Sequence, residues 1–285
     1  MKEAIKLVAN YLSVLKPRES ILLTFIGVCA AIVGAEGYPS ISPFLFALVA
    51  IGLGSSGCNA LTNYLDRKID ARMKRTCRRA LPSKRIYPPE KILPLAAALV
   101  ATALVLAWKL HPLCFLFGSI GVFAALTWRK RVTCVFPQGA LAGCAPVLVG
   151  YLAFSPHPNW TILFICLLIM IWIPLHVWSV MLANREDYIQ AGITYFPLNL
   201  KVKEAVKVLF LLSFLLYSTS IMLWWVADFG WLYFVTANLM GIATLYASAN
   251  LMRTQASKDA WKIYKLSAFP YLGLIFLAMC LNFWL

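Results

Sequence analysis

Residues 42–86 read SPFLFALVAIGLGSSGCNALTNYLDRKIDARMKRTCRRALPSKRI, and the segment changes character at Asn63. The part before Asn63 holds no charged residue, and it is as long as the roughly 20 residues that a helix needs to cross a bilayer. The part after Asn63 carries two aspartates and nine lysines or arginines. We therefore expect a membrane helix that leaves the bilayer near Asn63 and continues into a charged loop.

The rest of the chain repeats the apolar part of this pattern. Of its 285 residues, 61% are hydrophobic and 13% are charged, whereas soluble domains are about 45–50% apolar and about 25% charged. This balance excludes an ordinary soluble enzyme, a disordered chain and a secreted disulfide scaffold. We predict an all-α polytopic membrane bundle, a single domain over residues 1–285, with nine transmembrane helices at 20–36, 42–63, 91–109, 111–128, 138–154, 161–183, 206–226, 229–250 and 266–285.

The basic residues predict the orientation of this bundle in the lipid bilayer. The chain has 26 lysines and arginines against 11 acids, a net charge of +15. With nine spans, every lysine and arginine except Lys109 falls on one side, and cytoplasmic loops are rich in these residues. We expect the N-terminus inside and the C-terminus outside, in a multi-pass protein of the plasma membrane. The long loops and most acids share the inner side, so we expect the active site on the cytoplasmic side and no nucleic-acid partner.

Polar side chains lie on one face of the helix that ends in the charged loop. Asn63, Asp66 and Asp70 are three and four residues apart, which places them on one side of a helix, and Asn59 extends the row. Such oxygen ligands suit Mg²⁺, which proteins hold through one or two carboxylates together with substrate phosphates. The basic residues of the loop could neutralise the same phosphates. The alternative is a helix end that simply emerges into water.

This segment resembles a known motif. The pattern N-x-x-D-x-x-x-D followed by R-T-x-x-R-x-L-P-S is similar to the first aspartate-rich motif of the UbiA superfamily of intramembrane prenyltransferases. The resemblance implies a nine-helix bundle that joins a prenyl diphosphate to an apolar or aromatic acceptor with Mg²⁺. It assigns the Mg²⁺–diphosphate to Asn63, Asp66 and Asp70, which match the motif's acidic part, and to Arg75 and Arg79, which match its two arginines.

Two further segments extend the resemblance. The run Arg129-Lys130-Arg131-Val132-Thr133 is similar to the family's K-R-x-T element, so Lys130 and Arg131 are expected to reach the diphosphate. The usual tyrosine upstream is replaced by Ala125 and Leu126, and plain topological anchoring is the alternative. The run from His176 to Asp187-Tyr188 and Ala191-Gly192-Ile193 resembles the protoheme IX farnesyltransferase branch of the superfamily.

The second segment carries the remaining site predictions. By resemblance, Asp187 is catalytic and, with Glu186, a metal ligand, while Asn59, His176 and Tyr188 bind substrate. His176 could contact the porphyrin, or it could be a buried structural histidine. Ala183 stands where other branches carry an acid.

The resemblance implies that the chain moves a farnesyl group from farnesyl diphosphate to a vinyl group of heme b, giving heme O. One alternative is a related transferase that acts on a quinone-precursor ring or a glyceryl phosphate lipid. Another is a transporter or heme-binding membrane protein without chemistry.

Overall fold

The computed structural model describes residues 2–127 and 137–285. Within these ranges the regular elements are helices: α1 (Lys2–Val14), α2 (Pro17–Gly34), α3 (Ile41–Asp70), η1 (Pro89–Ile92), α4 (Leu93–Leu110), α5 (Pro112–Thr127), α6 (Gln138–Leu152), α7 (Trp160–Ala183), α8 (Arg185–Gln190), α9 (Val202–Val226), α10 (Trp231–Thr254), α11 (Ser257–Leu266), η2 (Ser267–Tyr271) and α12 (Leu272–Leu281). The prediction of an all-α fold is confirmed for the described part of the chain.

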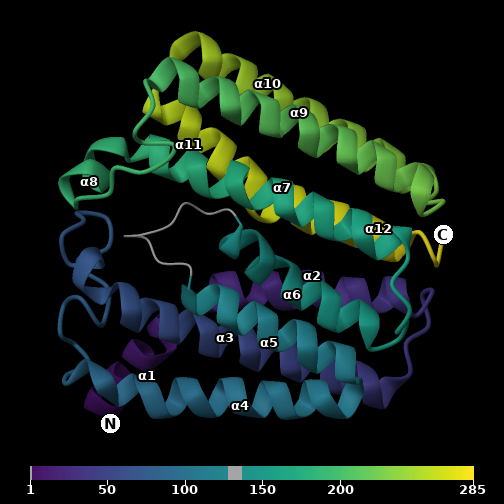
Figure 1. Ribbon diagram of the computed structural model, residues 1–285, viewed down its shortest axis with the longest axis horizontal. Coiled ribbons are helices and arrows are strands. Elements are labelled where there is room, and N and C mark those ends of the chain that lie inside the picture. The colour runs from purple at the N-terminus through teal and green to yellow at the C-terminus, as the bar shows by residue number, and fades with distance from the viewer. Residues whose placement is uncertain (1, 128–136) are drawn as a thin grey trace.

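The long helices form one bundle with successive layers (Figure 1). Helices α9 and α10 pair at one edge, and α7 lies between them and the rest, in contact with α9, α11 and α6. Helices α2 and α6 pair in the middle, and α3, α4 and α5 form the other edge. The two chain termini lie at opposite ends of the bundle (Figure 1).

Seven helical segments of the described residues are long and apolar enough to cross a membrane. Helices α5 and α6 match two further predicted spans, but they have only 16 and 15 residues. The nine-span count and the orientation therefore stay predictions. The outer faces of the bundle suit lipid, since Phe123 is 70% exposed, Leu239 66% and Trp225 79%. The chain is a multi-pass membrane protein.

The predicted helix boundaries differ from the structure in three places. Helix α3 continues beyond the predicted span end at Asn63 to Asp70, so Asn63, Asp66 and Asp70 lie on one helix, as their spacing predicted. The N-terminal segment forms α1, which no apolar span predicted. The last span is preceded by α11 and interrupted at η2, where Ala268 has a non-helical ψ of −128°. Pro270 explains this interruption because proline lacks the N–H that an unbroken helix uses.

A small residue lets helices α3 and α4 approach each other closely. A Cβ atom placed on Gly57 of α3 would lie 2.7 Å from Cγ2 of Val100 and 3.0 Å from the carbonyl oxygen of Ala96, both on α4. Such small residues allow close contact between membrane helices.

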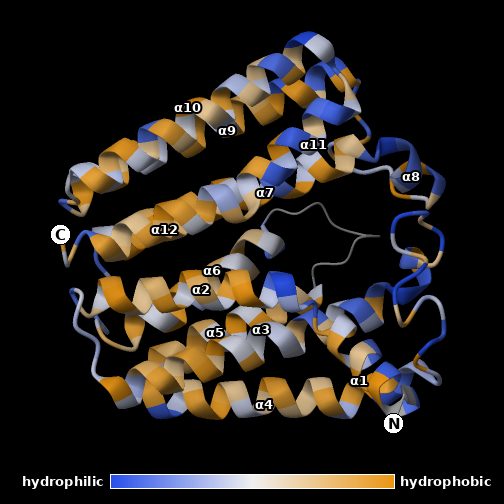
Figure 2. Ribbon diagram, turned by 180° about the vertical axis from the view of Figure 1, so that it is seen from behind, coloured by the Kyte–Doolittle hydropathy of each residue, from blue (hydrophilic) through white to orange (hydrophobic). Residues whose placement is uncertain are grey.

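Polar residues gather at one end of the bundle, where α1, α8 and the loop 71–88 lie, while the middle of the helices is hydrophobic (Figure 2). We call this region the polar end.

Candidate active site at the polar end

The carboxamides of α3 connect it to the N-terminal helices. The amide nitrogen of Asn63, 7% exposed, donates to the carbonyl oxygen of Val14 over 2.7 Å. The amide nitrogen of Asn59 donates to the hydroxyl of Ser20 over 3.0 Å. Both residues lie on the predicted face, and their nitrogens are used to join α3 to α1 and α2. Their carbonyl oxygens are the atoms that can bind a ligand.

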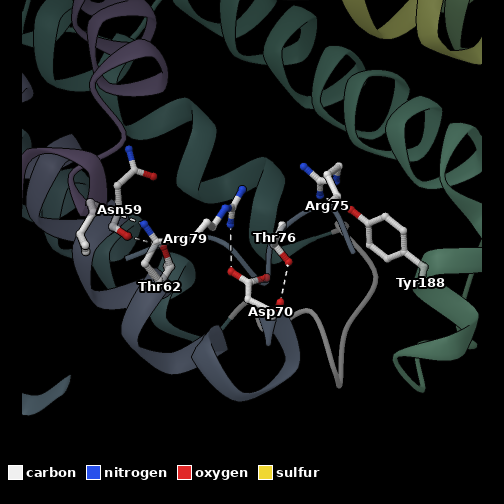
Figure 3. A network of polar contacts seen from close by, with 9 residues as sticks. Asn59, Thr62, Asp70, Arg75, Thr76, Arg79 and Tyr188 are labelled. Atoms are coloured by element: carbon white, nitrogen blue, oxygen red, sulfur yellow. Dashed lines mark hydrogen bonds and ion pairs between the residues drawn. The ribbon is translucent and has the colours of Figure 1, made fainter. Parts of the chain in front are cut away.

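Asp70 ends α3 and forms an ion pair with the loop that follows. Its carboxylate is 1% exposed, and its Oδ2 lies 2.9 Å from Nη1 of Arg79 (Figure 3). The hydroxyl of Thr76 donates to the Asp70 carbonyl oxygen over 2.9 Å. Because a buried charge must be paired to be tolerated, Asp70 fixes where Arg79 lies. The loop therefore folds back over the end of α3.

The α8 segment holds the same loop from its other side. Asp187 accepts from the backbone N–H of Lys74 over 2.7 Å and from that of Arg75 over 3.2 Å. The phenol oxygen of Tyr188 accepts from Nη2 of Arg75 over 3.1 Å, as Figure 3 shows. The predicted site residues of α3, α8 and the loop are thus brought together at the polar end.

A cavity of about 330 Å³ opens between α1, α3 and the loop, and we call it the basic cavity. Its volume lies at the lower end of the about 300–1,000 Å³ of small-molecule sites. None of the described residues that line it is acidic, and its charged and amide side chains come from Lys16, Asn63, Arg75, Arg78, Arg79 and Arg85. Five cations around one hollow favour a polyanion such as a diphosphate.

A second cavity of about 330 Å³ lies beside α8, and we call it the α8 cavity. It is lined by residues of both signs, including Lys74, Arg185, Glu186 and Asp187. Asn63 therefore faces a different hollow from Glu186 and Asp187. Among the residues that the structure describes, no three His, Cys, Asp or Glu side chains lie close enough together to hold a metal ion.

The donor set on α3 still fits a hard cation. Asn63, Asp66 and Asp70 offer only oxygen atoms, which is the chemistry that Mg²⁺ prefers. Asp187 differs because both of its carboxylate oxygens already accept hydrogen bonds from the loop backbone. The geometry gives Asp187 a positioning role for the loop.

His176 lies on α7 in an aromatic stack. Its ring lies 4.9 Å from that of Trp172 and 4.4 Å from that of Tyr264, both nearly parallel to it. Its Nδ1 lies 3.0 Å from the Ser267 hydroxyl, and the Trp172 indole N–H donates to the Ser267 carbonyl. These contacts join α7 to the interrupted helix at η2. The His176 ring thus has a hydrogen-bond partner and an aromatic ring on each side, as a buried structural histidine would.

Three basic residues differ from the rest of the site in how they were predicted or described. Lys130 and Arg131 lie outside the described residues. Lys16 also lines the basic cavity, although its place in the sequence predicted only that it marks the inner side of the membrane. No local pattern links Lys16 to the motif, because the two meet only when α1 lies against α3.

The comparison with protein families gives one assignment over most of the chain. A model described as the UbiA prenyltransferase family matches residues 21–280. A protoheme IX farnesyltransferase of Desulforudis audaxviator is 34% identical over 282 residues, which cover 96% of this chain and 88% of that protein. One of Symbiobacterium thermophilum is 32% identical and covers 97% and 95%.

Solved structures with this fold are more distant in sequence. A digeranylgeranylglyceryl phosphate synthase has a TM-score of 0.79 at 17% identity, over 98% of this chain and 99% of that chain. A UbiA homologue from Archaeoglobus fulgidus bound to GPP and Mg²⁺ has a TM-score of 0.65 at 14% identity, over 95% and 99%. At these identities the likeness concerns the fold.

Proposed function

Because the chain belongs to the UbiA prenyltransferase family, and is therefore an enzyme that transfers prenyl groups, we propose that it moves a farnesyl group from farnesyl diphosphate to a vinyl group of heme b. Diphosphate leaves as the prenyl carbon bonds to the vinyl group, and addition of one water to the cation that remains on the vinyl side chain, with loss of a proton, gives the hydroxyethylfarnesyl group of heme O. The proposed donor and acceptor rest on the curated relatives, which are named protoheme IX farnesyltransferases.

The observation that carries this proposal is the basic cavity. Its five cationic side chains surround a hollow beside the acidic face of α3. A diphosphate carries several negative charges within one small group, so this cluster of cations supports the donor half of the proposal. The site therefore binds the diphosphate at the polar end, and the prenyl tail extends into the apolar bundle.

The residues of the cavity act on the leaving group. When the bond between the prenyl carbon and the diphosphate oxygen breaks, negative charge grows on the diphosphate. The guanidinium groups of Arg75, Arg78 and Arg79 stabilise that charge because they are already positioned before the reaction. Asp70 positions Arg79, and Asp187 and Tyr188 position Arg75. The apolar helices exclude water, which would otherwise capture the allylic cation.

Mg²⁺ is the proposed cofactor. Asn63, Asp66 and Asp70 would hold it through oxygen atoms, and it would add positive charge beside the leaving diphosphate. A UbiA homologue was solved with GPP and Mg²⁺. Glu186 and Asp187 stay proposed ligands of lower rank, because they line the α8 cavity and Asp187 holds the loop backbone.

The remaining features of the proposal concern the membrane and the acceptor. We propose nine crossings by a single domain over residues 1–285, with the polar end on the cytoplasmic face of the plasma membrane, because the basic residues gather there. Heme b would approach from the bilayer. Asn59, His176 and Tyr188 are proposed to contact or position substrate.

The test is a reconstitution. Purified protein in lipid nanodiscs is incubated with heme b, farnesyl diphosphate and Mg²⁺, and the heme is analysed by mass spectrometry. We expect a heme with the mass of heme O that forms only when both substrates and Mg²⁺ are present. An unchanged heme, together with prenylation of an added aromatic acid or glyceryl phosphate lipid, would overturn the proposed acceptor.

A further inference from the structure

Helix α1 presents an apolar row that nothing in the described protein covers. Ile5 is 61% exposed, Val8 58% and Leu12 53%. At about 100° per residue, these positions fall on one side of the helix. Lys6 lies on the far side of the helix and is also exposed. The same side also carries the exposed Glu3 and Leu7. An apolar row on one side with mostly charged or polar residues on the other is typical of a helix that lies in a membrane interface.

The remaining faces of α1 contact the basic cavity. The amide oxygen of Asn10 accepts from Nη1 of Arg85 over 3.0 Å. The carbonyl oxygen of Val14 accepts from Asn63 over 2.7 Å, and Ser13 and Val14 line the cavity. Helix α1 is thus one wall of the basic cavity, and its apolar row points away from the loop it holds.

The connection to α2 fixes how far α1 can lie from the bilayer. Helix α1 ends at Val14 and the candidate membrane span α2 begins at Pro17. Two intervening residues reach at most about 10 Å. The C-terminal end of α1, which includes Leu12, must therefore lie close to the headgroup layer.

From these contacts we propose that α1 is an interfacial helix that binds anionic lipid. Ile5, Val8 and Leu12 enter the boundary between headgroups and acyl chains, while the exposed side chains of Lys6 and Arg18 lie beside the anionic headgroups. Lipid thereby holds the wall of the basic cavity in place. A second copy of the chain is a poorer occupant, because the short connection to α2 holds the end of α1 beside the bilayer, where lipid is present.

Photocrosslinking tests this assignment without depending on enzyme turnover. The photoreactive residue p-benzoyl-phenylalanine replaces Val8 in one sample of the full chain and Glu3, which is exposed on the opposite side of α1, in a matched control, each in nanodiscs of phosphatidylglycerol and phosphatidylcholine. We expect lipid adducts several-fold more abundant at position 8. Equal yields at the two positions, or adducts to a second copy of the chain at position 8, would overturn the proposal.

The preference for anionic lipid and the support of the cavity wall have separate tests. In nanodiscs of phosphatidylcholine alone, we expect fewer lipid adducts at position 8, and an unchanged yield would overturn the charge preference.

The double variant Val8→Gln/Leu12→Gln should increase amide hydrogen exchange at Asn10–Val14 by several-fold. The control Leu7→Gln makes the same kind of change on the opposite side of α1, where Leu7 is 53% exposed, and should not. Unchanged exchange in the double variant would overturn the idea that lipid holds this wall.

Discussion

The end of α3 and the short helix α8 both bring acids to the polar end, but their carboxylates have different partners. Asp70 is 1% exposed and pairs with the guanidinium of Arg79. Asp187 is partly exposed and accepts from two backbone N–H groups of the loop. The first carboxylate belongs to the charge balance of the basic cavity, and the second holds the loop that carries the cations. The two acids therefore have different roles: Asp70 pairs with a cation of the basic cavity, and Asp187 holds the backbone of the loop.

The largest expected effect comes from the α3 side of this comparison. Asp66→Ala and Asp70→Ala should each reduce prenyl transfer by about a hundredfold or more, because they remove charged groups from beside the leaving diphosphate. Product formation is measured by mass spectrometry of the heme. The control is Glu204→Ala, which removes an acid that is 52% exposed and pairs only within α9. Full activity in both aspartate variants would contradict the role of this face.

Asp187 should respond differently to two substitutions. Asp187→Ala removes both hydrogen bonds that this carboxylate accepts from the loop backbone, so the loop loses an anchor and the KM for the prenyl diphosphate should rise about tenfold, which corresponds to about 1.4 kcal/mol of binding free energy. Asp187→Asn keeps one acceptor oxygen and should restore part of this loss. Steady-state kinetics measure both. If Asn is as damaging as Ala and the Mg²⁺ dependence also shifts, Asp187 is a metal ligand, and the contrast between the two acids disappears.

The cations of the loop allow a sharper test of the basic cavity itself. Arg78 lines the cavity and Arg72, on the same loop, is exposed and lies outside that lining. Arg78→Gln should weaken prenyl diphosphate binding about tenfold, which corresponds to the loss of one charge-assisted hydrogen bond. Arg72→Gln should change binding little. Binding is measured by calorimetry in nanodiscs, and equal losses in the two variants would indicate a general charge effect rather than a site.

The sequence predicted the helical bundle because each membrane crossing needs a long apolar run, and such runs are visible one at a time. The break between α4 and α5 at His111 was also predicted, since Pro112 begins a new helix. The helix α1 was not predicted, because its 13 residues do not form an apolar run long enough to cross a bilayer. The predicted span ended at Asn63, whereas the shared face of Asn63, Asp66 and Asp70 implied the longer helix that α3 forms.

The site was predicted as a set of residue types but not as a set of contacts. The spacing of Asn63, Asp66 and Asp70 predicts a shared face, which needs only local helix geometry. The partners of Asp187 are more than a hundred residues away in the sequence, so they depend on how α8 returns to the loop. Lys16 was missed for the same reason, because its place beside the cavity is set by tertiary contacts of α1.

The smallest expected effect is that of Thr76→Val, which tests the hydrogen bond at the end of α3 without changing the charge of Asp70. Thr76 is fully buried, and its hydroxyl donates to the Asp70 carbonyl oxygen. Thr76→Val keeps the shape but removes this donor, so the free energy of unfolding should fall by about 1 kcal/mol and the Tm by about 2–4 °C. Thr76→Ser keeps the hydroxyl and should preserve most of the bond. Thermal unfolding in nanodiscs measures the shift.

Since Asp70 keeps its ion pair with Arg79 in both Thr76 variants, prenyl transfer below the Tm should change little. A loss of transfer as large as that of Asp70→Ala would mean that the loop conformation, and not the Asp70 carboxylate, is the sensitive feature of this region.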